Sequence, residues 1–156
     1  MPVADAARDA SRLPVLTGVQ PQQVPAFWPI VAPYIARKTA RYPNKPDLDA
    51  IYRDLVAGGR QLWIASSRER DGEGVLLTQI IVTDQGPVCA LRLVVGKEPE
   101  RWIHFLRTIE EWAASCGCCR MTTEWTRPSW RKLLPGYVLK QTRPDGCIWM
   151  DKELTI

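Results

Sequence analysis

Hydrophobic residues recur along this chain at two different spacings, and the spacing changes several times. Spacings of three and four residues predict helices over 25–41, 48–57 and 99–115, and a shorter helix is expected over 129–134. Apolar, β-branched runs predict strands over 14–19, 61–66, 75–82, 88–95, 120–126, 137–141 and 147–150. Because the run over 88–95 is nearly all apolar, we expect it to form a central strand that is covered on both faces.

Residues between these segments indicate where the elements end. Asp47 or Asp49 can cap the helix over 48–57, and two glycines follow that helix directly. Five charges and two glycines predict a hairpin loop over 68–74. An Asp-Gly pair within 143–146 predicts a tight turn between the last two strands.

The composition is that of an ordinary globular protein, with 46% hydrophobic and 24% charged residues in a chain of 156. We therefore expect a single folded domain over residues 13–156, preceded by a flexible arm over 1–12 that has few apolar residues. No apolar run is long enough to span a bilayer, and the first residues lack the pattern of a signal peptide. These features predict a protein that is not exported and whose five cysteines are reduced thiols.

The predicted elements follow one another as strand, two helices, three strands, helix, strand, short helix and two strands. With the stretches 112–118 (Trp-Ala-Ala-Ser-Cys-Gly-Cys) and 133–137 (Leu-Leu-Pro-Gly-Tyr), this order resembles the Gcn5-related N-acetyltransferase (GNAT) family over residues 14–156. The resemblance implies an α/β fold with a mixed central sheet of about six to seven strands flanked by about four helices. It also implies acetyl-CoA as the cofactor and N-acetyl transfer as the activity of an intact member.

A longer stretch, from Glu110 through Tyr137, resembles small acetyltransferase-like proteins that are encoded among bacteriophage structural genes. Some of those proteins are internal virion or assembly proteins. This second resemblance implies a scaffold retained for binding in a particle or during its assembly. Phage structural proteins would then be the partners, and the host cytoplasm or the virion would be the location.

The loop after the central strand is where a GNAT enzyme holds the pyrophosphate of its cofactor on backbone N–H groups. If acetyl-CoA binds here, the resemblance assigns it to Val94, Val95, Gly96, Lys97 and Arg101. The loop has one glycine where the family has a closely spaced pair, and Pro99 removes one N–H donor. Glu98 and Glu100 add carboxylates where phosphate would sit. We therefore expect no cofactor and no affinity for acetyl-CoA tighter than millimolar.

No catalytic residue is carried over from the family. Its members often place a tyrosine four residues before the glycine of their Gly-Phe/Tyr pair, and Lys132 stands at that position here. Glu124 could act as a base on the neighbouring strand, but an exposed strand carboxylate is the better interpretation.

A metal site is not expected either. Cys116 and Cys119 have the spacing of two zinc ligands, but a structural zinc site needs two more. His104 precedes Cys116 on the same predicted helix by about 18 Å at the rise of an α-helix. We interpret it as a solvated histidine.

The segment from Arg120 to Arg143 carries six basic residues and one acid. Tryptophan and arginine dominate the energetically important contacts of protein interfaces, so we expect a protein partner to bind at Arg127, Trp130, Arg131 and Lys132. Base stacking and phosphate contacts over 120–143 would also suit single-stranded nucleic acid. Core tryptophans beside a solvated basic face would explain the same pattern without any partner.

The sequence thus favours a catalytically degenerate GNAT-fold protein that acts as a binding or structural component, with a bacteriophage virion or assembly role. An active acetyl-CoA-dependent N-acetyltransferase is the first alternative. A nucleic-acid-binding accessory module is the second.

Overall fold

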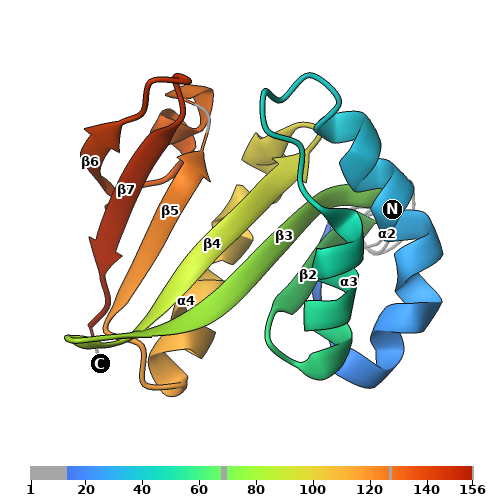
Figure 1. Ribbon diagram of the computed structural model, residues 1–156, viewed down its shortest axis with the longest axis horizontal. Helices are drawn as coiled ribbons and strands as arrows, with labels where there is room; N and C mark the ends of the chain where they lie inside the picture. The colour runs from blue at the N-terminus through green and yellow to red at the C-terminus, as the bar shows by residue number, and fades with distance from the viewer. Residues whose placement is uncertain (1–13, 68–69, 127, 156) are drawn as a thin grey trace, which may run out of the picture.

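The computed structural model describes residues 14–67, 70–126 and 128–155, so the predicted arm over 1–12 lies outside the described residues. Its strands are β1 (Val15–Val19), β2 (Gln61–Ser67), β3 (Arg70–Thr83), β4 (Gly86–Gly96), β5 (Arg120–Thr126), β6 (Val138–Thr142) and β7 (Ile148–Glu153). They form one sheet in the order β1-β2-β3-β4-β5-β7-β6 (Figure 1). β4 and β5 run parallel and all other neighbours run antiparallel, which confirms the expected mixed sheet with β4 at its centre.

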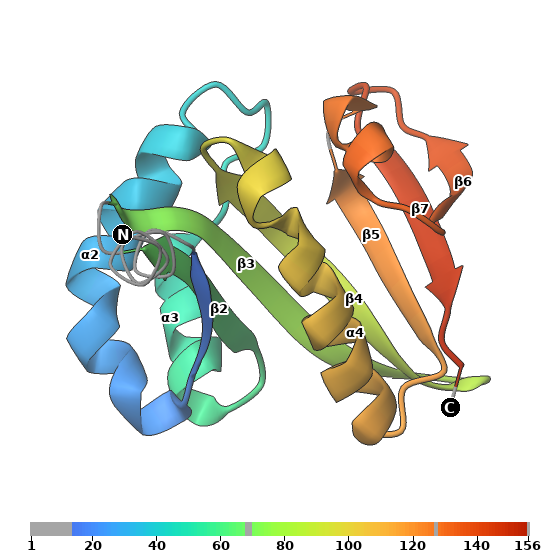
Figure 2. The same ribbon diagram turned by 180° about the vertical axis from the view of Figure 1, so that it is seen from behind.

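The helices lie on both faces of the sheet and create two cores. α2 (Val24–Lys38) and α3 (Leu48–Ala57) pack over β2 and β3, whereas α4 (Leu106–Ser115) crosses the opposite face (Figure 2). Short 3-10 turns complete the described elements: η1 (Pro21–Gln23), η2 (Pro99–Arg101), η3 (Ile103–Phe105) and η4 (Pro128–Leu133). The short helix expected over 129–134 is therefore present as the 3-10 helix η4.

α3 begins and ends as its flanking residues indicate. Oδ1 of Asp47 accepts a hydrogen bond from the N–H of Ala50 at 3.1 Å, so Asp47 is the N-cap of the two candidates. Gly58 follows the helix with a φ of 84°, the left-handed conformation that glycine adopts at low cost.

The hairpin loop predicted over 68–74 is wrong for most of its length. β3 already begins at Arg70, which pairs with Ser67, and Gly74 pairs with Ala65 on one side and with Gly96 on the other. The glycine that suggested a turn has a different role inside the strand. The indole of Trp102 occupies the space where a Cβ of residue 74 would lie.

The single helix predicted over 99–115 is wrong at its start. Residues 99–101 and 103–105 form η2 and η3, and α4 begins at Leu106. The fully buried indole of Trp102 lies between the two turns, and seating it against β3 interrupts the helix. From Leu106 onward the predicted apolar stripe is confirmed, since Ile109 and Ala113 are buried with it.

Candidate functional site

β4 and β5 separate halfway along β4. Their parallel pairing runs from Val88 opposite Arg120 to Leu91 opposite Thr123. β4 then continues as far as Gly96 in pairing with β3. The two strands lie side by side at the bottom of Figure 1 and spread apart toward the top. The edge of β4 that faces β5 is therefore open beyond Leu91.

A β-bulge in β4 lies at the point of separation. β3 pairs Leu77 with Leu93 and its next residue, Thr78, with Leu91, so Arg92 is the extra residue of the bulge. Leu91 packs in the core under α4, whereas Leu93 packs against the core under α2 and α3. A bulge bends its strand and increases the local twist, which explains why β4 turns away from β5 here.

The opening between the strands is a cleft of ≈ 640 Å³, a volume in the range of small-ligand sites. Residues 91–94 of β4 line it from the sheet. The loop over 41–46, between α2 and α3, contributes one wall. Residues 128–130 of η4 and 145–147 of the turn before β7 contribute the rest. The cleft therefore joins segments from both halves of the chain.

Positive charge dominates the cleft. Arg41 and Lys45 are exposed on the α2–α3 loop, and Arg92 is half-buried on β4. Asp145 is the one carboxylate among the described lining residues. Nε of Arg92 donates to Oε1 of Gln79 at 3.2 Å, which anchors this side chain to β3. Three cations against one anion give the cleft a preference for an anionic occupant.

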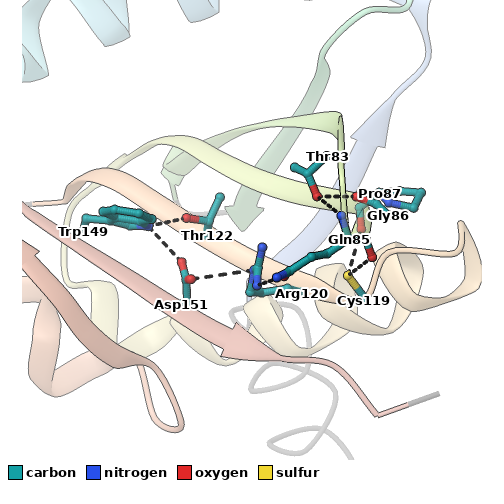
Figure 3. A network of polar contacts seen from close by, with 9 residues as sticks. All are labelled: Thr83, Gln85, Gly86, Pro87, Cys119, Arg120, Thr122, Trp149 and Asp151. Carbon is teal, nitrogen blue, oxygen red and sulfur yellow. Dashed lines mark hydrogen bonds and ion pairs between the residues drawn. The ribbon is translucent and has the colours of Figure 1, made fainter.

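A polar network joins neighbouring elements at the end of the sheet where β4 and β5 are paired (Figure 3). Nε1 of Trp149 donates to Oγ1 of Thr122 at 2.7 Å and to Oδ1 of Asp151 at 2.9 Å. Nε of Arg120 lies 3.7 Å from Oδ2 of Asp151, and its Nη1 donates to Oε1 of Gln85 at 3.1 Å. These contacts join β5 and β7 to the turn between β3 and β4. They hold β4 and β5 together at this end of the sheet, and the cleft lies at the opposite end.

The loop after β4 directs its hydrogen-bond donors inward. The N–H of Arg101 donates to the carbonyl of Glu98 at 2.9 Å, and the N–H of Trp102 donates to that of Pro99 at 3.1 Å. Nε1 of Trp102 donates to the carbonyl of Lys97 at 2.8 Å. The guanidinium of Arg101 also lies 3.8 Å from the Glu98 carboxylate. Two backbone N–H groups that could face a phosphate, those of Arg101 and Trp102, are thus occupied within the loop.

The five residues assigned to a cofactor have different environments. Val94 lines the cleft, whereas Val95 is buried in the core under α2 and α3. Gly96 ends β4, the Lys97 side chain is exposed and Arg101 is half-buried. The structure therefore brings one of the five to the cleft. Val95 and Gly96 belong to the end of β4, and Lys97 and Arg101 to the segment that follows it.

The residues of the predicted partner surface also have different environments. Trp130 is half-buried, lines the cleft, and has its ring centroid 5.8 Å from that of Trp102. Arg131 and Lys132 are exposed on η4, and Lys132 lines a second groove along α4. Arg127 lies outside the described residues. Trp130 thus lines the cleft between β4 and β5, whereas Lys132 lines the separate groove along α4.

The second groove, of ≈ 1190 Å³, has the buried Glu110 among its lining residues. Oε2 of Glu110 accepts from the hydroxyl of Tyr137 at 2.8 Å, and its Oε1 accepts from Nζ of Lys152 at 2.8 Å. Burial, and then the nearby carboxylate, raise the pKa of Tyr137 above its ordinary value, so the phenol stays protonated and donates. These contacts fasten α4 to β7 and to the chain before β6.

Thiols and the histidine complete the candidate chemistry. All five cysteines are free, with Cys89 buried and Cys116 exposed. Burial raises the pKa of the Cys89 thiol to about 12, so it is neutral at physiological pH. His104 is exposed and its ring centroid lies 4.3 Å from that of Phe105. Within the described ranges, no group of three or more His, Cys, Asp or Glu residues is placed to hold a metal ion.

Glu124 lies in β5, but its side chain is outside the described part of the chain. None of the helices in that part has the length and apolar character needed to cross a membrane.

Sequence reasoning missed most of the cleft. Arg41 and Lys45 lie more than 40 positions before Arg92, and Asp145 and Cys147 more than 50 after it, so spacing could not connect them. One signal was available, because Arg92 is the single charged residue in the apolar run over 88–95. A charge in the middle of a central strand indicates that one side of the strand is open at that point.

The fold has counterparts among solved structures. Aminoglycoside 6′-acetyltransferase type Ii is similar at a TM-score of 0.67 and 15% identity, over 91% of this chain and 98% of that one. YhbS, a GNAT-family N-acetyltransferase from Escherichia coli solved in complex with CoA, is similar at a TM-score of 0.62 and 11% identity, over 92% and 83%. A GNAT-family acetyltransferase from Staphylococcus aureus is similar at a TM-score of 0.61 and 10% identity, over 90% and 100%.

No family model matches the sequence, and no curated protein matches it significantly. The structural similarity and the seven-stranded mixed sheet show that this chain has the GNAT fold, as the element order indicated. At identities this low the similarity concerns the fold, and the activity has to be argued from the site itself.

Proposed function

We propose that this protein is a GNAT-fold binding protein whose cleft between β4 and β5 holds a ligand, while the loop after β4 has lost the features that bind CoA. The observation that carries the proposal is the pattern of donors in that loop. The N–H groups of Arg101 and Trp102 are bonded to carbonyls of the same loop. Pro99 has no N–H group to offer.

The residues present do not fit the pyrophosphate of CoA. Two negatively charged phosphates favour free N–H groups at a helix start and glycines that allow a close approach. Here Glu98 and the exposed Glu100 bring carboxylates to the turn. Trp102 fills the space between the loop and β3. Lys97 and Arg101 offset some of this charge, but Arg101 already faces Glu98.

Calorimetric titration with CoA and with acetyl-CoA tests this proposal. We expect no heat of binding that indicates a dissociation constant tighter than millimolar. A micromolar constant that is lost in a Lys97→Glu variant would show that the loop does hold phosphates, and the proposal would fail. Lys97 is exposed, so this variant should fold normally.

An active N-acetyltransferase is the second candidate, and the open edge of β4 favours it. The cleft and the bulge at Arg92 leave room for an extended molecule beside β4, and the structural neighbours named above are acetyltransferases. Release of free CoA from acetyl-CoA in the presence of a panel of amines would support this candidate. Its absence at millimolar acetyl-CoA would favour the binding protein.

A role in a bacteriophage particle rests on the sequence resemblance alone. It would be supported by finding this chain, at a fixed ratio to the major structural proteins, in particles purified on a density gradient. Nucleic-acid binding through 120–143 is tested by titration with a single-stranded oligonucleotide.

A further inference from the structure

The outer side of α2, which faces away from the sheet, has the features of an interaction surface. We propose that a second copy of this chain packs on it, so that the two α2 helices form an antiparallel pair. The surface lies outside the cleft, and the inference does not depend on what the cleft binds. Two observations support it: the helix has no charged residue over 24–36, and two prolines inside it alter its backbone hydrogen bonding.

The inner side of α2 is fully used within the fold. Val24, Val31 and Ile35 are buried in the core that α2 and α3 share with the sheet. Trp28 is partly buried on the same side, with its ring centroid 5.5 Å from that of Tyr52 on α3. These contacts fix α2 at the margin of the molecule, where both views place it (Figure 1 and Figure 2).

The outer side of α2 is apolar as well. A surface helix normally carries charged and polar residues on the side opposite the core. Here the exposed positions of α2 before Arg37 are all proline, alanine or isoleucine, namely Pro25, Ala26, Pro29, Ile30, Pro33 and Ala36. The Ile30 side chain is 68% exposed. Because these residues follow one another at helical spacings of three and four, they form one continuous apolar patch.

The absence of charge favours a second copy of the same chain as the partner. A two-fold axis places the same surface of both copies together, so a charged residue near the axis meets its own charge on the other copy. No side chain over 24–36 is charged, so two copies of this patch meet without like-charge repulsion. In an antiparallel pair centred between Ile30 and Pro33, each of these side chains packs against the other one on the second copy.

Backbone acceptors on α2 favour a protein partner over a lipid surface. Because proline has no N–H group, Pro29 and Pro33 leave the carbonyls of residues 25 and 29 without their usual donors four residues later. In the antiparallel pair, the exposed Arg37 of one copy lies beside residue 25 of the other, and its guanidinium has several N–H groups to donate. Hydrocarbon offers such carbonyls no donor.

The size of the patch determines the expected strength of the dimer. α2 has 15 residues and is about 22 Å long at the rise of an α-helix. A single helix pair of this length gives an interface at the lower end of the range for specific complexes. We therefore expect a reversible dimer with a dissociation constant on the order of 10–100 μM.

Sedimentation velocity at increasing protein concentration tests self-association. Wild-type protein should change from monomer to dimer between about 5 and 500 μM. Ile30→Glu places a charge at the centre of the patch and should raise the dissociation constant at least about tenfold. The matched control is Val82→Glu, which adds the same charge at a valine of β3 that is 81% exposed, and it should dimerise like the wild type. A wild type that stays monomeric at about 500 μM, or equal losses in both variants, would overturn the inference.

Complementary charges test the two-fold packing itself. Ile30→Lys/Pro33→Lys and Ile30→Glu/Pro33→Glu should each stay monomeric, because like charges meet across the axis. An equal mixture of the two should form a heterodimer that weakens as salt is raised. Replacing a proline inside a helix favours the helix, so both variants should melt no lower than Ile30→Lys and Ile30→Glu alone. A mixture that remains monomeric would show that these positions do not face each other.

Arg37 tests the antiparallel arrangement. Arg37→Ala removes the donor expected beside residue 25 of the second copy and should weaken the dimer about threefold or more. Lys38→Ala is the control, since it removes the same charge from the next position, which lies in line with Val31 on the inner side. It should keep the wild-type dissociation constant, and equal constants for the two variants would contradict the antiparallel pair.

Co-sedimentation with phosphatidylcholine vesicles distinguishes a lipid surface from a second copy. We expect the wild type to remain in the supernatant. Binding to the vesicles by a wild type that stays monomeric in solution, and its loss in Ile30→Glu but not in Val82→Glu, would assign the patch to lipid and overturn the inference.

Discussion

A Cβ atom at Gly74 would lie 2.6 Å from Cε2 of Trp102, closer than real Cβ atoms approach another heavy atom. The two residues come from β3 and from the loop that leads to α4. Trp102 is fully buried and donates its indole N–H to the carbonyl of Lys97. The missing side chain at position 74 is therefore what allows the indole to close the loop after β4.

Substitution Gly74→Ala should destabilise the protein by about 1–3 kcal/mol, the usual range when a packed core receives an extra carbon. The indole is rigid and hydrogen-bonded, so it cannot move aside cheaply. Gly18→Ala is a matched control, because Gly18 also lies in a strand facing a tryptophan, but its Cβ would be 3.2 Å from Trp63. Urea denaturation should show a clearly smaller loss for Gly18→Ala, and equal losses would contradict this account.

The order of elements could be predicted from the sequence because it depends on local periodicity. The seven strands, and α3 between Asp47 and Gly58, follow from alternation and from capping residues. The helix predicted from residue 99 could not be placed correctly, because its break depends on a contact between Trp102 and Gly74 that joins distant segments. From the sequence, Gly74 is predicted to lie in a turn. Glycine is favoured both in turns and where another group comes close to the backbone, so the sequence alone does not distinguish the two.

The candidate site was less predictable than the fold. Arg41, Arg92 and Asp145 come together because β4 and β5 diverge, and that divergence follows from a one-residue bulge. The charge of Arg92 indicates that β4 is open at that point, but it does not indicate that the strand contains a bulge there. The departure of the loop after β4 from the family's glycine-rich pattern, in contrast, is visible in the sequence as Glu98 and Pro99. A loop that binds phosphate requires backbone donors and glycines at those positions.

Glu98 provides a test of the loop itself. Its φ of 46° lies in the left-handed region, which costs an ordinary residue about 1 kcal/mol more than glycine. Glu98→Gly and Glu98→Ala both remove the carboxylate that faces Arg101, but glycine alone relieves the backbone. We expect the glycine variant to be more stable than the alanine variant by about 1 kcal/mol in thermal denaturation. The opposite order would mean that this conformation carries no strain.

The buried carboxylate of Glu110 makes Lys152 important for stability. The side chains are 9% and 31% exposed, and their atoms approach to 2.8 Å. Lys152→Met should cost about 2 kcal/mol because it leaves the buried carboxylate without a positive partner, and the hydrogen bond from the Tyr137 hydroxyl alone does not neutralise its charge. Adding Glu110→Leu to this variant should recover part of that loss. The exposed pair Arg107–Glu111 is the control, and its double-mutant cycle should give a coupling of about 0.5 kcal/mol or less. Similar couplings for the two pairs would show that burial does not strengthen the contact with Lys152.

Cys89 links stability to pH at the alkaline end. Its thiol has an ordinary pKa of 9.0, and burial raises the pKa to about 12 in the folded protein. The thiol is neutral in both states below pH 9, so its contribution to stability is fully present there. As the pH rises from 9 toward 12, the unfolded chain loses this proton while the folded chain keeps it. Stability therefore falls over this window by about 1.4 kcal/mol per pH unit from this one group.

Comparison of Cys89→Ala with the wild type isolates that contribution. The variant loses packing and is less stable at neutral pH, but its free energy of unfolding should decline less steeply above pH 9, where the thiol of the unfolded chain begins to titrate. The other ionisable groups are the same in both proteins, so the difference in slope belongs to Cys89. Leu91→Ala removes a neighbouring buried side chain that does not titrate, and should keep the wild-type slope. Urea denaturation under reducing conditions between about pH 8 and 11 measures all three slopes. If the free energies of unfolding of Cys89→Ala and of the wild type ran parallel with pH, this thiol would ionise as readily in the folded protein as in the unfolded chain.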